Sequence, residues 1–161
     1  MYEDRVVKAV ELFKEGYNCS QSVVGAFADL YGFTPEQAFR MSSSFGGGIG
    51  RMRETCGAAC GLFMLAGLET GATTGSDKEG KAANYALVQQ LADKLKSENG
   101  SIVCGVLLGL RKPEVELQKA NDLSPVPAER TEQYYKKRPC VQLVEQAASL
   151  WAQYLEQKKG I

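Results

Sequence analysis

The side chains of this sequence with the most useful chemistry are its five cysteines, at positions 19, 56, 60, 104 and 140. No two of them form a CxxC pair, which excludes a zinc ribbon and a thioredoxin motif. The chain contains no histidine, so Ser-His and Cys-His catalysis, histidine-ligated zinc and CxxCH haem attachment are excluded as well. A site that uses several of these cysteines must therefore be assembled by the tertiary fold.

The central stretch, residues 42–71, combines glycines, arginines and two of the cysteines. Glycine allows positive φ and close backbone approach, and successive free N–H groups in such loops form concavities that bind anions. The residues predicted to bind a cofactor are Gly46, Gly47, Gly48, Gly50, Arg51 and Gly57. The alternative is a glycine-rich turn into a tightly packed helix, whose cysteines are small hydrophobic residues.

Cys56 and Cys60 lie four residues apart in a segment that predicts a short apolar helix. Residues four apart share one face of a helix, so both sulfurs can point the same way. Cys60 is accordingly a further candidate redox thiol, although it could equally fill space in the core.

Apolar spacing and capping residues predict helices throughout the chain and no strand. Asn18 with Gln21 and Thr34 with Gln37 have the pattern of capping boxes. The predicted helices span residues 4–16, 19–31, 34–45, 55–68, 77–99, 101–110 and 140–157. The expected architecture is an all-α, single-domain bundle of about six to seven helices over residues 1–161, with Val7 and Tyr85 on apolar faces.

Residues 111–139 differ from the rest, because four of the five prolines fall there among many charges. The pattern predicts a surface excursion with at most one helical turn. It could serve as a lid or merely connect two helices.

Cys19, Cys56, Cys104 and Cys140 each fall in the first turn of a different predicted helix. Unpaired N–H groups and the helix dipole stabilise a thiolate there, so we expect lowered pKa values at Cys19 and Cys56. If these helix starts converge, the four thiolates suit an iron–sulfur cluster or, less readily, zinc. Close thiols could instead cycle between dithiol and disulfide. Isolated cysteines that only pack in the core are the third possibility.

The remaining composition narrows the class of protein. Nineteen cationic side chains balance nineteen anionic ones, so no net field attracts nucleic acid or an acidic membrane. The longest apolar run, residues 56–68, is too short to span a bilayer, and the charged N-terminal segment does not have the pattern of a signal peptide. These features predict a cytoplasmic protein with an unknown redox partner; a homodimer remains open.

Four segments resemble the C-GCAxxG-C-C family of redox-active proteins. They are GYNCSQSVVGAF with Cys19, SFGGGIGRMRETCGAACG with Cys56, CGVLLGL with Cys104 and CVQLVEQAA with Cys140. The motif stands here as Cys56-Gly57-Ala58-Ala59-Cys60-Gly61, with its first two letters reversed relative to the family name. The fold is also similar to part of split-Soret cytochrome c, in which an iron–sulfur cluster accompanies haem.

The resemblance implies electron transfer through those four cysteines, either as ligands of an iron–sulfur cluster or as redox thiols. Haem is not implied, because histidine and CxxCH are absent. Cys60 takes a family position usually filled by a small residue. Two other classes stay open: a helical partner protein with structural cysteines, and a phosphate or nucleotide site at the glycine loop, although neither GxxxxGK[ST] nor GxGxxG after a strand is present.

Overall fold

The computed structural model describes residues 1–110 and 123–160, and within them the regular elements are all helical. The predicted all-α class is confirmed. The α-helices of this part are α1 (Glu3–Lys14), α2 (Cys19–Phe27), α3 (Pro35–Ser42), α4 (Gly57–Thr70), α5 (Lys78–Asn99), α6 (Cys104–Leu107), α7 (Glu132–Lys137) and α8 (Cys140–Lys158). Two 3-10 helices, η1 (Ala28–Tyr31) and η2 (Ser43–Phe45), continue α2 and α3.

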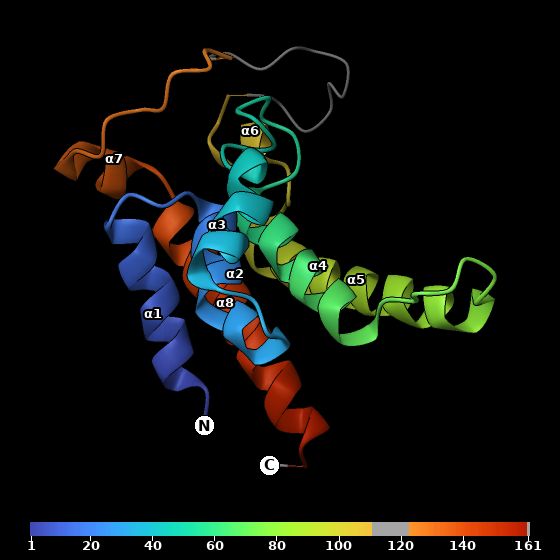
Figure 1. Ribbon diagram of the computed structural model, residues 1–161. Coiled ribbons are helices and arrows are strands. Elements are labelled where there is room, and N and C mark those ends of the chain that lie inside the picture. Colours follow the sequence, from blue (N-terminus) through green and yellow to red (C-terminus); the bar gives the residue numbers. More distant parts are fainter. Residues whose placement is uncertain (111–122, 161) are drawn as a thin grey trace.

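Helix α2 is the centre of the packing, because α1, α3, α4 and α8 all contact it (Figure 1). Helices α4 and α5 pack on each other and extend away from this group as an arm. The largest fully buried side chains are shared among these helices: Phe13 of α1, Phe27 of α2, Leu62 of α4 and Trp151 of α8. The core therefore fixes the start of α2 relative to the starts of α4 and α8.

The predicted capping boxes are confirmed at both α2 and α3. The Asn18 side chain accepts a hydrogen bond from the Gln21 N–H at 2.9 Å, and the Gln21 side chain accepts one from the Asn18 N–H. Thr34 and Gln37 do the same at α3. Each box satisfies two N–H groups that the helix leaves unpaired, and so fixes the residue at which the helix begins.

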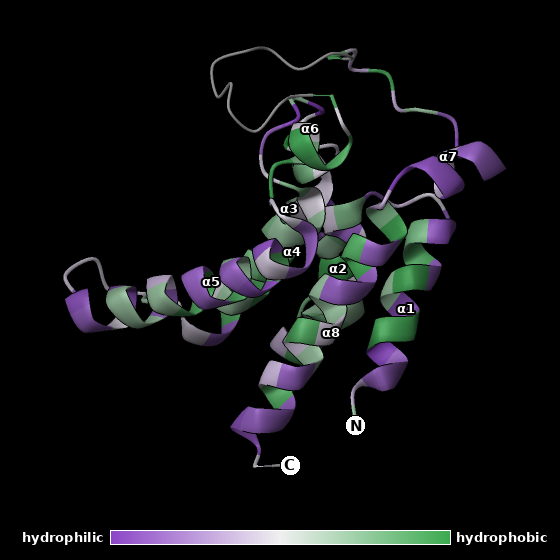
Figure 2. Ribbon diagram, turned by 180° about the vertical axis from the view of Figure 1, so that it is seen from behind, coloured by the Kyte–Doolittle hydropathy of each residue, from purple (hydrophilic) through white to green (hydrophobic). Residues whose placement is uncertain are grey.

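Two expected burials are wrong. Val7 is 55% exposed and Tyr85 is 60% exposed. Helix α5 buries only Leu91, Ala92 and Leu95, and Tyr85 lies on the half of the helix that precedes them. Figure 2 shows much of the α5 surface to be hydrophilic. The apolar stripe predicted for this helix is therefore buried only where α5 meets the body.

The segment 101–110 also differs from its prediction. Its first three residues are not helical, because Thr55 and Val103 form an antiparallel bridge. The Cys56 N–H donates to the Ile102 carbonyl and the Cys104 N–H to the Glu54 carbonyl, both at 2.6 Å. Cys104 is consequently the first residue of a four-residue helix rather than the third residue of a long one. The bridge holds the segments of Cys56 and Cys104 side by side.

The predicted surface excursion is described only in part. Residues 111–122 lie outside the described residues, whereas residues 123–127 are exposed and α7 supplies the short helix before Pro139. In the part of the chain that the structure covers, none of the helices combines the length and the apolar character needed to cross a membrane.

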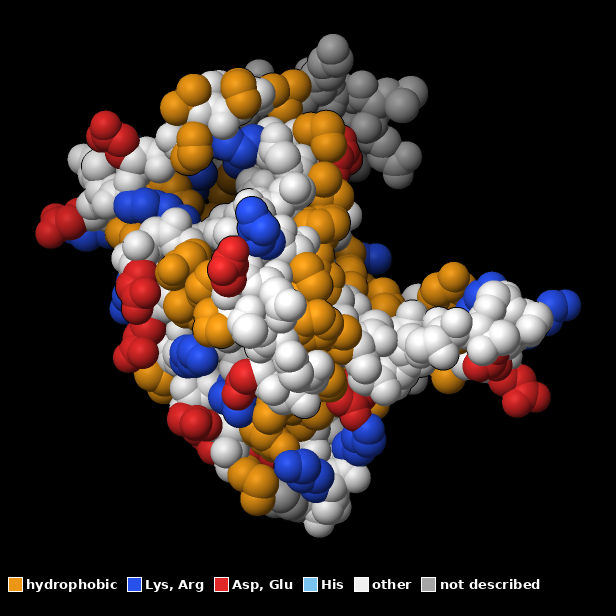
Figure 3. Space-filling view, in the orientation of Figure 1, with side chains coloured by type: hydrophobic (Ala, Val, Ile, Leu, Met, Phe, Trp, Pro, Cys, Tyr) orange, Lys and Arg blue, Asp and Glu red, His pale blue; other side chains and the backbone are white. Residues whose placement is uncertain are grey.

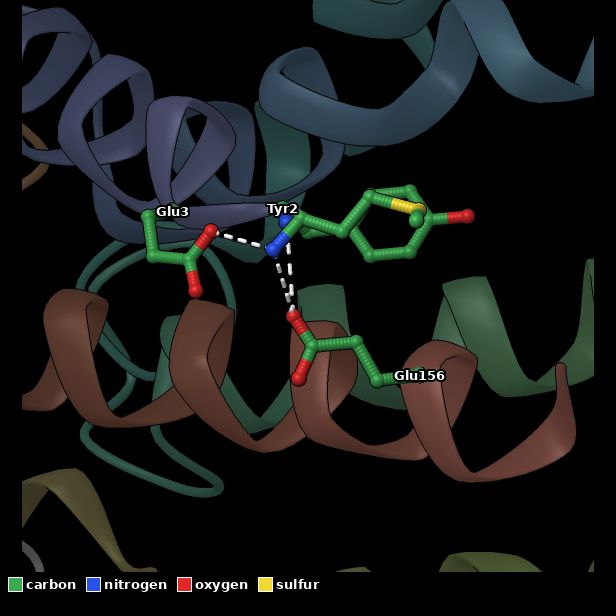
Figure 4. Close-up of polar contacts among 4 residues, drawn as sticks. Tyr2, Glu3 and Glu156 are labelled. Carbon is green, nitrogen blue, oxygen red and sulfur yellow. Dashed lines mark hydrogen bonds and ion pairs between the residues drawn. The ribbon is translucent and has the colours of Figure 1, made fainter. Parts of the chain in front are cut away.

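The N-terminus lies close to the last turns of α8 (Figure 1). The terminal amino group donates to Glu156 Oε1 at 3.1 Å and also pairs with Glu3, and the Tyr2 N–H donates to Glu156 at 3.4 Å (Figure 4). Pairs this exposed contribute little stability. The buried faces of α1 and α8 hold this end together.

Candidate functional site

Four cysteines line one small cavity of about 30 Å³ at the end of the core. Cys19, Cys104 and Cys140 are the first residues of α2, α6 and α8, and Cys56 is the N-cap residue of α4. All four are free thiols and at most 9% exposed. The structure thus brings together the four cysteines that the sequence predicts as a group.

Cys60 lies outside this cavity. It is half-buried on α4, and its thiol donates to the Thr55 carbonyl at 3.7 Å. Burial raises the pKa of Cys60 to about 11. One helical turn beyond Cys56 is enough to direct the Cys60 sulfur away from the other four.

The glycines of the CGAACG motif allow α4 to pack closely against α2. A Cβ on Gly57 would lie 2.8 Å from the Phe45 carbonyl oxygen and 3.2 Å from Cys19 Cβ. On Gly61 it would lie 3.0 Å from Val23 Cβ. Such contacts are too short for a side chain, so these two glycines set the separation between Cys56 and Cys19.

The glycine loop forms the opposite wall of the cavity and has a strained backbone. A Cβ on Gly48 would lie 2.5 Å from Cys104 Cβ. Positive φ values continue past the glycines to Ile49 (66°), Arg51 (61°) and Arg53 (63°). A β-branched residue seldom adopts such a value, and strain of this kind, about 1–3 kcal/mol per residue, is typical of functional sites.

Three arginines place positive charge beside the sulfurs. Arg53 is 1% exposed, and its Nη1 lies 3.8 Å from Cys104 Sγ. Arg138 lines the same cavity, and its charge acts on Cys104 and Cys140. Arg130 acts on Cys140 from the neighbouring segment. The low dielectric of the interior strengthens each of these interactions.

The cysteine pKa values separate Cys140 from the others. A hydrogen bond from the Cys19 thiol, then Arg138, the Tyr134 hydroxyl and Arg130, outweigh burial and lower the pKa of Cys140 to about 7. The same hydrogen bond, together with burial, raises the pKa of Cys19 well above its ordinary value. Cys140 is therefore the group that holds the negative charge, and Cys19 holds the proton.

Burial dominates on the other side of the cavity. It raises the pKa of Cys56 to about 12, although the N–H groups of Ala58 and Ala59 act in the opposite direction. It also raises the pKa of Cys104 against the effect of Arg53. The expectation of lowered pKa values at Cys19 and Cys56 is therefore wrong. At Cys56 two helix N–H groups do not offset the desolvation, and at Cys19 the hydrogen bond to Cys140 adds to burial.

The predicted cofactor-binding residues divide between two cavities. Gly48 and Gly57 line the cysteine cavity, whereas Gly46, Gly50 and Arg51 line a larger one of about 410 Å³. Gly47, Arg53 and Arg138 line both, so the two cavities adjoin. Within the described chain, no group of three or more His, Cys, Asp or Glu side chains is arranged to hold a metal ion.

Arg130, Tyr134 and Arg138 are the site residues that the sequence analysis missed. They lie within residues 111–139, the predicted surface excursion. One signal was present: aromatic and basic residues crowd the ten positions before Cys140, in RTEQYYKKRP. That composition resembles a solvated helix face as much as a site, so only the packing of α7 distinguishes the two.

The fold and the cavity define a class: a small helical protein that gathers four cysteines, one from the start of each of four helices. The chain matches the family described as putative redox-active protein, C-GCAxxG-C-C, over residues 17–154, and it belongs to that family. The resemblance seen in the sequence is thereby confirmed. Comparisons with curated proteins and with solved structures gave no match.

Proposed function

We propose that the four-cysteine cavity is the redox centre of this protein and that Cys140 and Cys19 are its exchanging pair. One observation carries the proposal: Cys19 and Cys140 line the same small cavity beside Arg138, where the Cys19 thiol is the main cause that lowers the pKa of Cys140 to about 7. A thiol with a pKa near the ambient pH is the best attacking group for thiol–disulfide exchange. Family membership supports redox activity in general.

The chemistry uses a disulfide as electron acceptor. The Cys140 thiolate attacks one sulfur of the acceptor, forms a mixed disulfide and expels the other half of the acceptor as a thiolate, which takes up a proton. Cys140 then no longer carries a charge, so the main cause of the raised Cys19 pKa disappears. Cys19 loses its proton and attacks the Cys140 sulfur, which releases the second thiol. Two protein thiols and one disulfide thus become one protein disulfide and two thiols.

The test is oxidation of the reduced full-length protein by a small disulfide, followed by peptide mass spectrometry. We expect one intramolecular bond, between Cys19 and Cys140. Cys140→Ser should abolish the reaction, whereas Cys60→Ser, the matched control outside the cavity, should leave it unchanged. A disulfide that joins other cysteines, or none at all, would contradict the proposal.

An iron–sulfur cluster held by Cys19, Cys56, Cys104 and Cys140 is a second candidate function. The observation that favours it is the donor set, since four thiols from four separate helix starts line one cavity with arginines close by. Such a cluster would supply one-electron transfer. The cavity has room for about two water molecules, so the four helix starts would have to move apart to hold it.

Anaerobic purification separates the two candidates. A brown protein with visible absorbance, iron and acid-labile sulfide, all lost in a Cys56→Ser variant, supports the cluster. A colourless protein that forms the Cys19–Cys140 disulfide supports thiol exchange. The physiological partner in either case is a redox protein or metabolite, and a cytoplasmic setting suits the free thiols because that compartment keeps cysteines reduced.

A further inference from the structure

The larger cavity beside the cysteines has the size of a small-molecule site, about 410 Å³. It is lined by the glycine loop on one side and by the segment around Pro125 and Pro127 on the other. It adjoins the cysteine cavity through Gly47, Arg53 and Arg138. Cys140 is only 9% exposed and lines that adjoining cavity together with Arg138.

Arginine is the only charged residue type among the described residues that line this cavity. The four are Arg51, Arg53, Arg130 and Arg138. Figure 3 shows Lys and Arg side chains around a hollow between the α6 and α7 ends of the molecule. A concave surface with one sign of charge concentrates ligands of the opposite sign.

Two of these arginines are held by carbonyl oxygens and aromatic rings, and the negative group on which they act is the Cys140 thiolate. Arg130 donates to the carbonyl oxygens of Phe13 and Tyr17, at 2.7 and 2.9 Å, and its guanidinium lies over the Phe13 ring. The Arg138 guanidinium lies 4.7 Å from the centre of the Tyr134 ring. Within the described residues no carboxylate pairs with either arginine. Both are half-buried, a setting in which a charged ligand adds more than it does at a fully solvated surface.

Arg51 shapes the cavity by joining its two walls. Its Nη1 donates to the carbonyl oxygens of Ser124 and Val126, across from the glycine loop. Gly46 and Gly47 have no room for side chains in this loop: a Cβ would lie 2.5 Å from Asn18 Nδ2 at Gly46 and 2.7 Å from Arg51 Cγ at Gly47. The walls are held in place before a ligand arrives, which lowers the entropic cost of binding.

We propose that this cavity binds a small disulfide that carries carboxylates and presents its sulfur atoms to Cys140. The planar guanidinium of arginine matches a carboxylate with two parallel hydrogen bonds. That the ligand is a disulfide rests on the proposed thiol exchange. That the cavity binds carboxylates does not depend on that exchange. The electrons pass from Cys19 and Cys140 to this disulfide, which leaves as two carboxylate-bearing thiols.

Three disulfides of similar length and different charge test the proposal: dithiodipropionate is anionic, bis-hydroxyethyl disulfide is neutral and cystamine is cationic. The measured quantity is the rate of Cys19–Cys140 disulfide formation, divided by the rate of each reagent with a free small thiol. We expect dithiodipropionate to exceed the neutral reagent by about tenfold or more, since a charge-assisted contact of ordinary strength gives that ratio. Cystamine should be the slowest.

Arginine variants test whether the preference for anionic over neutral disulfides comes from this cavity. Arg51→Gln and Arg138→Gln should lower the ratio of anionic to neutral rates toward one. The ratio is the readout because loss of Arg138 also changes the pKa of Cys140 and slows every reagent. Arg40→Gln, which replaces an 82% exposed arginine on α3, is the matched control and should keep the ratio of the original protein. Equal normalised rates for anionic and neutral disulfides, with the bond still formed, overturn the substrate class and leave thiol exchange standing.

If no disulfide reacts with the protein, the proposed thiol exchange is overturned. The carboxylate site is then tested by a binding measurement. Adipate, a dicarboxylate without sulfur, is titrated into the protein that carries both Cys19→Ser and Cys140→Ser, and heat is recorded by calorimetry. Saturable binding that Arg51→Gln weakens and Arg40→Gln does not supports the carboxylate site. Absence of binding overturns it.

Discussion

The cysteine cavity has two sides that look alike in sequence and differ in chemistry. Cys19 and Cys140 line the cavity together with Arg138, and the hydrogen bond between them lowers the pKa of Cys140 to about 7 and raises that of Cys19. Cys56 and Cys104 face the glycine loop, and burial keeps both protonated. All four stand at helix starts, so the helix N-terminus does not decide which sulfur is charged. The neighbours from other elements decide it.

The largest effect should appear in alkylation of the native protein. At pH 7 Cys140 is about half thiolate, whereas Cys56, with a pKa of about 12, is almost wholly protonated. We expect Cys140 to react with iodoacetamide at least about a hundredfold faster than Cys56. Peptide mass spectrometry of quenched samples measures both rates, and denatured protein provides the control. Similar rates in the native state would remove the difference between the two sides.

The glycine-loop side should be the more sensitive to added volume. Gly48→Ala puts a methyl group 2.5 Å from Cys104 Cβ at a positive φ, so the free energy of unfolding should fall by about 2–4 kcal/mol. Gly67→Ala is the control, since nothing lies within 4 Å of its Cβ, and it should raise stability by about 0.5–1 kcal/mol. Urea unfolding measures both. An unaffected Gly48→Ala protein would mean that this wall is not rigid.

The two sides should also respond to pH in opposite directions. The pKa of Cys140 falls from 9.0 to about 7 on folding. Its ionisation therefore stabilises the folded state increasingly as pH rises from about 7 to 9, and this stabilisation is lost as pH falls through 7. The pKa of Cys56 rises from 9.0 to about 12, so its contribution is full below pH 9 and is lost toward pH 12. Unfolding of the original protein and of Cys140→Ser should therefore diverge between pH 7 and 9. Parallel curves in that window would contradict the lowered pKa.

A smaller effect tests which neighbour sets the charge. Arg138→Gln removes a cation beside Cys140, and the midpoint of its pH-dependent alkylation should rise by about one unit. Arg40→Gln should leave the midpoint in place. If both variants match the original protein, then Arg138 does not set the pKa of Cys140, and the remaining partners Cys19, Tyr134 and Arg130 do.

The smallest effect should come from Cys60→Ala. Cys60 lies outside the cavity, and alanine is a strong helix former, so both the fold and the redox reaction should persist. The change in unfolding free energy should stay within about 1 kcal/mol. Loss of disulfide formation in this variant would make Cys60 a participant and would extend the site along α4.

Local sequence was sufficient for most of the fold. Cap residues such as Asn18 and Thr34 fix helix starts through contacts three residues away, so the helix starts at Cys19 and Pro35 could be read directly. The α6 helix could not, because its start at Cys104 depends on a bridge between residues 55 and 103. The predicted burial of Tyr85 is wrong for a related reason: an apolar face is buried only where another helix covers it.

The sequence by itself determined the helical class and the starts of α2, α3 and α8, since each of these follows from residues close together in the chain. It also singled out the four cysteines, because each lies at the start of a predicted helix. Only the tertiary structure decided that those cysteines line one cavity, that Cys60 does not, and that Cys140 carries the charge. The pKa of a buried thiol is the balance of desolvation against nearby charges and hydrogen bonds. In this protein those partners are Cys19 of α2, Tyr134 of α7, and Arg130 and Arg138 on either side of α7, and packing alone brings them to one sulfur.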